Sequence, residues 1–277
     1  MINAVELYIG LRYLRAKRRT RFVSFVTGVS LLGIALGVAA LIVILSVMNG
    51  FEGELRGRLL SMTAHGYVAA EEGPLEDWQS VRAQVLDSDG VTAAAPFVEM
   101  EGMIRARSKL RPVFVSGVYP EFEQDVSGRT INFVAGDLDV LVAGQRSIVL
   151  GRLLALDLGV RVGDNVLLLI PKPTGDGNLE PMLERFAVRG IFEAGVQDHD
   201  ASLALVPASE AARILDYDEA VTAVRFLAED VMEAPDVANR LVTELGSKYR
   251  ASDWTVENAS YFRAIRLEKM MMSLILS

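Results

Sequence analysis

The chain has 277 residues, of which 51% are hydrophobic, and its formal net charge is −8. Residues 1–50 contain six basic side chains and one acid, Glu6, so they carry +5 and the remaining residues carry −13. An acidic body lacks the basic surface that nucleic-acid phosphates require, so we expect no nucleic-acid partner. Because the chain has no cysteine, disulfides and thiolate metal sites are excluded.

The first segment, residues 1–21, has the pattern of a basic amphipathic helix. Val5, Tyr8 and Ile9 recur at helical spacing, and basic side chains fill the later turns. Apolar residues on one face and basic residues on the other are typical of helices that lie along a membrane surface. We therefore predict a cytoplasmic amphipathic segment over residues 1–21.

An uncharged run of 30 residues follows, from Phe22 to Phe51. A helix needs about 20 apolar residues to cross a bilayer core, so we predict a transmembrane helix over residues 22–50. The run is too long and too uniformly apolar for a buried core helix. It also exceeds the apolar region of a cleaved signal peptide, which is about 7–15 residues long.

The flanking charges predict the orientation of this helix. Basic residues precede it, so the positive-inside rule places the N-terminus in the cytoplasm and the acidic body in the periplasm of a bacterium. Within the helix, Gly33 and Gly37 are four residues apart, a spacing that lets a second helix approach closely. The alternative is that glycine is simply common in membrane helices.

Residues 51–262 mix short strands and helices, and we predict an α+β domain with two lobes. Residues 77–87 and 234–249 have the apolar spacing of amphipathic helices. Residues 147–170 predict a strand, a helix from Arg152 to Leu158, a turn and a second strand.

The segment 171–184 is predicted to be a long loop between two strands. Loops of this length in compact domains are often functional. Leu179, Pro181 and Met182 are residues that a solvated loop has little reason to carry, and exposed Met and Leu indicate a protein-binding surface. The alternative is that these side chains fold back onto the domain.

No catalytic or metal-binding motif stands out. Asp198, His199 and Asp200 are consecutive, so their side chains diverge, and a polar turn is the better interpretation. The sequence contains no nucleotide-binding G-x-x-x-x-G-K-[ST] motif and no hydrolase motif. We therefore expect no catalytic site, no metal site and no bound cofactor in this chain, and we do not expect an enzyme.

The sequence ends on FRAIRLEKMMMSLILS, residues 262–277. Charged residues at helical spacing precede an apolar tail that is too short to cross a bilayer. We expect residues 263–277 to be the start of a second transmembrane helix, so that the chain is truncated within a longer protein.

Several motifs, in this order, carry a resemblance to a known family. They include IGLRYLRAKRR, GIALGVAALIV and LSVMNGFE near the start, then HGYV, LGRLLALDLGVRVGDNV and DHDASLALVPASEAARIL. Together they resemble the bacterial lipoprotein-releasing permeases of the LolC/LolE family, over essentially the whole chain. Some motifs are more similar to LolE and others to LolC, so the subtype stays open.

The resemblance implies a subunit of an ABC transporter in the bacterial inner membrane. Such a permease has four transmembrane helices and a large MacB-like periplasmic core domain, here residues 51–262. Its implied partners are a LolD-like ATPase subunit that binds ATP and Mg, a second permease subunit, a LolA-like periplasmic chaperone and lipoprotein substrates. The complex releases lipoproteins from the inner membrane to the chaperone for sorting to the outer membrane.

The resemblance also implies roles for individual residues. In LolC-type members a projecting loop, the Hook, captures the chaperone, and residues 171–184 occupy the matching position. The implied chaperone contacts are Leu179, Pro181 and Met182, with Arg185 as a polar contact by position. Leu179 stands where the family has an aromatic residue. The implied lipid contacts lie at the outer end of the first helix, at Val43, Val47 and Met48.

Two alternatives to this function stay open at the level of sequence. One is a MacB- or FtsX-like mechanotransmitting permease with other clients. The other is a single-pass anchored periplasmic binding protein.

Overall fold

The computed structural model describes residues 21–60, 64–127, 131–173 and 179–257, together with Leu267, Met270 and Met271. The chain divides into two compact units, Met1–Gly57 and Arg58–Ser277, and each is described by itself. The predicted amphipathic segment 1–21, apart from Arg21, and most of the predicted start of a second transmembrane helix, 263–277, lie outside the described residues.

A single long helix, α2 (Arg21–Leu60), dominates the first unit. Its apolar part, Phe25–Val47, has a mean hydropathy of 2.7, and none of it is buried among the described residues. A soluble protein would hide such a surface, so length and composition both fit a membrane-spanning helix. The helix contains the predicted 22–50 segment and continues one residue before it and ten beyond it.

The second unit is built on one mixed sheet of ten strands. In chain order the strands are β1 (Gly66–Ala70), β2 (Val91–Ala106), β3 (Lys109–Val118), β4 (Asn132–Ala135), β5 (Ser147–Gly151), β6 (Asn165–Pro173), β7 (Leu179–Glu193), β8 (Leu203–Pro207), β9 (Ala223–Ala228) and β10 (Tyr249–Asp253). The hydrogen-bonded order is β10-β1-β9-β2-β3-β8-β5-β7-β4, and β6 pairs with both β2 and β7.

The double pairing of β6 closes six strands into a barrel. The strands β2, β3, β8, β5, β7 and β6 form a ring, each paired with its two neighbours. Their inward side chains are apolar and buried, including Ile104, Leu150, Leu168 and Phe186. Because a barrel this small is filled by its own side chains, it is a packed core and not a channel.

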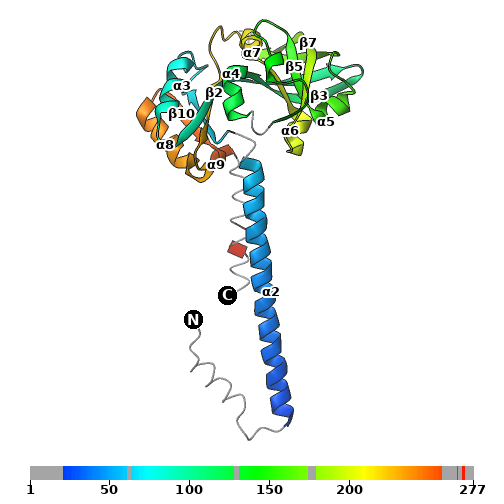
Figure 1. Ribbon diagram of the computed structural model, residues 1–277, viewed down its shortest axis with the longest axis vertical. Coiled ribbons are helices and arrows are strands. Elements are labelled where there is room, and N and C mark those ends of the chain that lie inside the picture. The colour runs from blue at the N-terminus through cyan, green and yellow to red at the C-terminus, as the bar shows by residue number, and fades with distance from the viewer. Residues whose placement is uncertain are drawn as a thin grey trace. The chain divides into compact units, whose positions relative to one another are not determined.

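The remaining strands form a second lobe that shares the long strand β2. The first half of β2 continues the sheet through β9, β1 and β10. Around it lie α3 (Trp78–Asp87), α8 (Ala234–Leu245) and α9 (Trp254–Glu257), while α5 (Arg152–Leu158) and α6 (Gln197–Ser202) lie at the barrel end (Figure 1). The predicted two-lobed α+β fold is therefore confirmed.

Two further short helices follow strands of the barrel. Helix α4 (Pro120–Val126) follows β3, and α7 (Ala208–Leu215) follows β8. The 3-10 turns η1 (Leu138–Val140) and η2 (Val231–Glu233) complete the described elements.

Glycines explain where helices α5 and α8 end, and the end of α8 differs from the prediction. Helix α5 matches the predicted Arg152–Leu158 and ends at Gly159, whose φ of 70° suits a glycine cap. The predicted helix over 234–249 is too long, because α8 ends at Leu245 and residues from Tyr249 form β10. Gly246, with φ 91°, breaks the helix.

The chain enters and leaves the second lobe at adjacent positions. Gly66 at the start of β1 lies opposite Asp253 at the end of β10. The backbone N–H of Trp254 donates to the carbonyl of His65 at 3.1 Å, and the Nδ1 of His65 accepts from the N–H of Ala228 at 3.0 Å. The two points where the domain meets its flanking segments are therefore tied together by hydrogen bonds.

Candidate functional site

The segment predicted to be a long loop, 171–184, is mostly a β-hairpin, so that prediction is wrong. Strand β6 continues to Pro173 and β7 begins at Leu179, and the pairing extends to the Pro173–Leu179 pair. The prolines misled the loop prediction. Pro171 and Pro173 are two residues apart on β6, and Pro181 of β7 lies directly opposite Pro171. All three therefore occupy the same kind of position in the strand ladder, which can be the kind whose N–H points away from the partner strand.

We call the outer part of this hairpin, Ile170–Pro173 with Leu179–Leu183, the arm. Strand β2 pairs with β6 only from Leu167 to Leu169, so beyond that point, among the described strands, β6 and β7 pair only with each other. An unsupported two-stranded ribbon is marginally stable by itself. The arm therefore depends on contacts at its base.

Side-chain contacts at the base of the arm are both apolar, through the buried Ile170, and electrostatic. Glu184, almost fully buried, accepts from Arg146 at 3.0 Å and from Arg213 at 3.0 Å. The hydrogen bond to Glu184 is the main cause that raises the pKa of Arg213, and Glu210 adds to it. Closer to the tip, Lys172 pairs with Asp216 at the end of α7. These ion pairs fix the direction in which the arm leaves the barrel.

The arm places the predicted chaperone contacts in different environments. Pro181 is exposed, and Arg185 just below the arm is exposed too. Met182 is half-buried and packs against the main core cluster, so for this residue the alternative that it folds back onto the domain applies. The side chain of Leu179 lies outside the described residues. Leu183, which faces the opposite way from Met182, is 60% exposed.

Strand pairing extends the exposed surface of the arm across the barrel, which the sequence did not reveal. Leu183 lies opposite Leu169, which lies opposite Met103. In the next row, Arg185 lies opposite Leu167, which lies opposite Arg105. Directly opposed residues share a face of a sheet, so apolar and arginine side chains alternate in rows on the outer surface. Residue type gives no signal for this surface, because Leu183 is exposed and Glu184 is buried, the reverse of what their side chains suggest.

The predicted membrane-helix residues lie on α2. A methyl group added at Gly33 or Gly37 would meet no atom within 4 Å, so in the described chain no second helix packs against them. Val43 and Val47 are 60% and 66% exposed, and the side chain of Met48 lies outside the described residues. Helix packing at the glycines and lipid contact at the valines stay predictions.

The segment Asp198–Asp200 is part of the short helix α6 and not a turn. Asp200 is buried and accepts hydrogen bonds from the N–H groups of Ala194 at 2.6 Å and Gly195 at 3.3 Å. This carboxylate therefore holds the loop before α6. Across the described ranges, no group of three or more His, Cys, Asp or Glu side chains could hold a metal ion.

Comparison with known proteins agrees with this architecture. The family model of the MacB-like periplasmic core domain matches residues 27–244. The LolC protein of Xylella fastidiosa strain Temecula1 is 41% identical over all of this chain and 67% of its own length, and that of Neisseria meningitidis is 38% identical over 99% of this chain and 66% of its own. LolE of Haemophilus influenzae is 31% identical over 96% of this chain and 65% of its own length.

These relatives carry the name "lipoprotein-releasing system transmembrane protein", either LolC or LolE, and the chain spans about two thirds of their length. Both names occur among them, so the comparison does not separate the two subtypes. The matches extend over the membrane helix, the barrel and the second lobe alike. The chain belongs to the LolC/LolE family of lipoprotein-releasing system transmembrane proteins.

Proposed function

We infer that this chain is a permease subunit of an ABC transporter that releases lipoproteins from a bacterial inner membrane. The observation that carries this inference is the identity of 41% to a LolC protein along the full length of the chain. The apolar helix Phe25–Val47 provides the membrane anchor. The part of the MacB-like core domain match that follows this helix, up to residue 244, provides the periplasmic part.

We propose the rest of the assembly on the same basis. The complete transporter contains a second permease subunit and a separate ATPase subunit, which binds ATP and Mg and performs the hydrolysis. The N-terminus lies in the cytoplasm, because the basic residues that precede α2 favour that side.

For the arm we propose capture of a periplasmic lipoprotein chaperone. An exposed hairpin with Pro181 at its edge and Leu183 60% exposed offers apolar contacts that the domain itself leaves uncovered. Arg185 and Arg105 border these contacts with positive charge. A hydrophobic centre with an arginine-containing rim is a common composition of protein–protein interfaces.

A pull-down of a LolA-like chaperone by the full chain in detergent tests this role. We expect the Pro181→Ala/Leu183→Ala double variant to retain less than a tenth of the wild-type capture, because both changes remove exposed apolar contact from the arm. Leu156→Ala is the matched control, since Leu156 is a 65% exposed leucine on α5, away from the arm. Equal capture by the wild type and the double variant would show that the arm does not bind the chaperone.

A further inference from the structure

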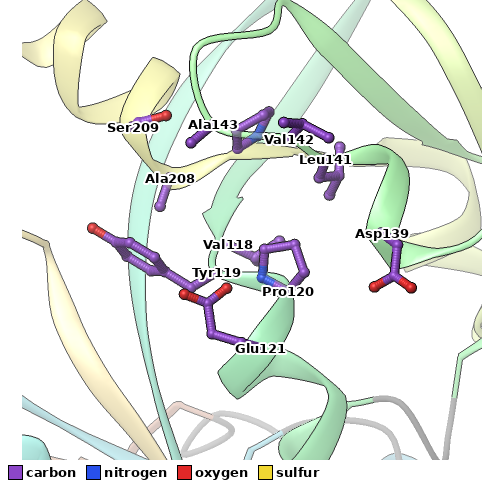
Figure 2. A pocket seen from close by; sticks show the side chains of 11 residues that line it. Val118, Tyr119, Pro120, Glu121, Asp139, Leu141, Val142, Ala143, Ala208 and Ser209 are labelled. Carbon is purple, nitrogen blue, oxygen red and sulfur yellow. The ribbon is translucent and has the colours of Figure 1, made fainter.

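A second surface feature lies away from the arm, where two parallel strands end. Strands β3 and β8 are parallel neighbours, and Val118 at the end of β3 lies beside Pro207 at the end of β8. A crevice of about 440 Å³ opens at this point (Figure 2). None of the arm residues lines it. We call it the strand-end crevice.

The crevice exists because the chain leaves the two strands in different directions. Helix α4, after β3, packs through Val126 on Ala93 and Ala95 of β2. Helix α7, after β8, packs through Ala211 against Gly117 and Val98, on the other face of β2. Diverging connections at the carboxyl ends of neighbouring parallel strands leave a gap that proteins commonly use for binding.

The walls of the crevice are mainly apolar. Val118, Pro120 and Leu141 come from β3, α4 and the segment after η1. Val142 and Ala143 also line the crevice; Val142 is 46% exposed, and Ala143 is exposed as well. This exposed apolar rim indicates an occupant larger than one small molecule, because only a larger partner would cover it.

The charge of the crevice is negative. Glu121 and Asp139 lie on either side of Pro120 (Figure 2), and both are exposed. Within the described part of the chain, neither carboxylate has an ion-pair partner. Tyr119 also lines the crevice, and burial raises the pKa of its phenol, with further contributions from the charges of Glu121 and Glu219.

This combination selects one ligand chemistry. Two unpaired carboxylates repel phosphate and carboxylate groups, which disfavours anionic lipid headgroups and nucleic acid. An apolar wall beside a carboxylate suits a side chain with a methylene stem and a cationic end, which is the chemistry of lysine and arginine. We propose that the strand-end crevice docks a lysine- or arginine-bearing segment of a protein partner.

The docked side chain lies with its methylene groups against Pro120 and Val142, and its cationic end reaches Glu121 or Asp139. Flanking apolar residues of the segment cover Val142 and Ala143. This contact adds to chaperone capture by the arm and does not depend on it, because no residue is shared between the two surfaces.

A peptide titration of the full chain in detergent micelles tests the proposal. The probe is Gly-Leu-Arg-Leu-Gly, and its control contains citrulline, which keeps the shape of arginine without the charge. Tryptophan emission reports binding, because Trp78 packs on Tyr119 with ring centroids 5.2 Å apart and is one of only two tryptophans in the chain. We expect at least tenfold tighter binding of the arginine peptide.

Two variants locate the binding site. Glu121→Gln/Asp139→Asn should abolish the preference for arginine, whereas Glu71→Gln/Glu72→Gln, an exposed pair with the same change in net charge, should keep it. Ala143→Phe leaves both carboxylates in place and fills the mouth, so it should weaken both peptides. Circular dichroism verifies that each variant is folded.

Three outcomes would overturn the proposal. The first is equal affinity for the arginine and citrulline peptides. The second is an equal loss in the two acid-to-amide pairs, which would indicate general attraction to an acidic domain. The third is equal binding of arginine methyl ester and the peptide, which would indicate a site for small cations. The titration does not involve lipoprotein release, so failure here leaves the proposed transport function untouched.

Discussion

The second lobe and the arm show two opposite uses of the same sheet. In the lobe, β1 is paired on both sides, by β9 and β10, and its residues Val68 and Ala69 are buried. In the arm, β6 and β7 pair only with each other among the described strands, and Leu183 is 60% exposed. The lobe is therefore stabilised by strand pairing where the flanking segments attach, whereas the arm leaves apolar surface exposed.

A buried ion pair strengthens this contrast. Glu123 of α4, about 1% exposed, accepts from Arg225 of β9 at 2.7 Å, and the Ser127 hydroxyl donates to its other oxygen. The guanidinium also lies 4.8 Å from the ring centroid of Phe97. The ion pairs of the arm, such as Lys172 with Asp216, include at least one largely exposed partner. Substitutions in the lobe should therefore lower the free energy of unfolding, whereas substitutions in the arm should weaken chaperone capture.

Glu123→Gln should give the largest effect. It removes one partner of a buried pair and leaves the Arg225 charge uncompensated, which we expect to cost about 3 kcal/mol of unfolding free energy. Urea denaturation followed by circular dichroism measures the change.

Glu121→Gln is the control for this substitution, since Glu121 is exposed on the same helix. We expect its effect to stay within about 0.5 kcal/mol. A loss below about 1 kcal/mol for Glu123→Gln would mean that the lobe does not depend on the pair, and the contrast with the arm would fail.

Gly66→Ala should give the next effect, at the entry of the lobe. A methyl group on Gly66 would lie 2.5 Å from the carbonyl oxygen of Ser252 and 2.6 Å from the ring of Phe226. Because strands β9 and β10 hold both groups in place, we expect a loss of about 2 kcal/mol from overpacking. The midpoint of thermal denaturation reports it.

Gly50→Ala adds the same methyl group to α2, where no atom lies within 4 Å. We expect it to leave the denaturation midpoint of the periplasmic domain unchanged. If Gly66→Ala proved equally neutral, the close pairing at the entry would be looser than the structure indicates.

Leu183→Ser should have the smallest effect on stability. The side chain is 60% exposed on the arm, so the free energy of unfolding should change by no more than about 0.5 kcal/mol. Chaperone capture should nevertheless fall, because an apolar contact is lost. A stability loss as large as that of Gly66→Ala would show that the arm is part of the core, and would remove the distinction between the two regions.

Local sequence could predict elements whose pattern is short-range. The uncharged run from Phe22 to Phe51 predicted the membrane helix. The spacing of Trp78, Val81, Val85 and Leu86 predicted α3, in which the first three are buried and Leu86 is half-buried. The strand–helix–strand pattern over 147–170 was likewise confirmed. In each case the spacing of apolar residues and the positions of glycines are enough to predict the element, because residues close in sequence form it.

The error at 171–184 has a specific cause. Prolines and glycines favour a loop, but a proline removes no hydrogen bond when its nitrogen faces away from the partner strand. Whether the nitrogen faces away depends on the position of the proline in the strand ladder, and that position depends on the register between β6 and β7. The residue type alone does not contain that information.

By itself the sequence determined the membrane helix, the class of the fold, the family and the position of the arm along the chain. Tertiary structure decided which side chains meet. The closure of β6 onto β2, the rows that bring Arg185 near Arg105, the buried pair of Glu123 and Arg225, and the strand-end crevice all join residues far apart in the chain. Pairings of this kind depend on strand order and register, which residues distant in sequence fix jointly when the core packs.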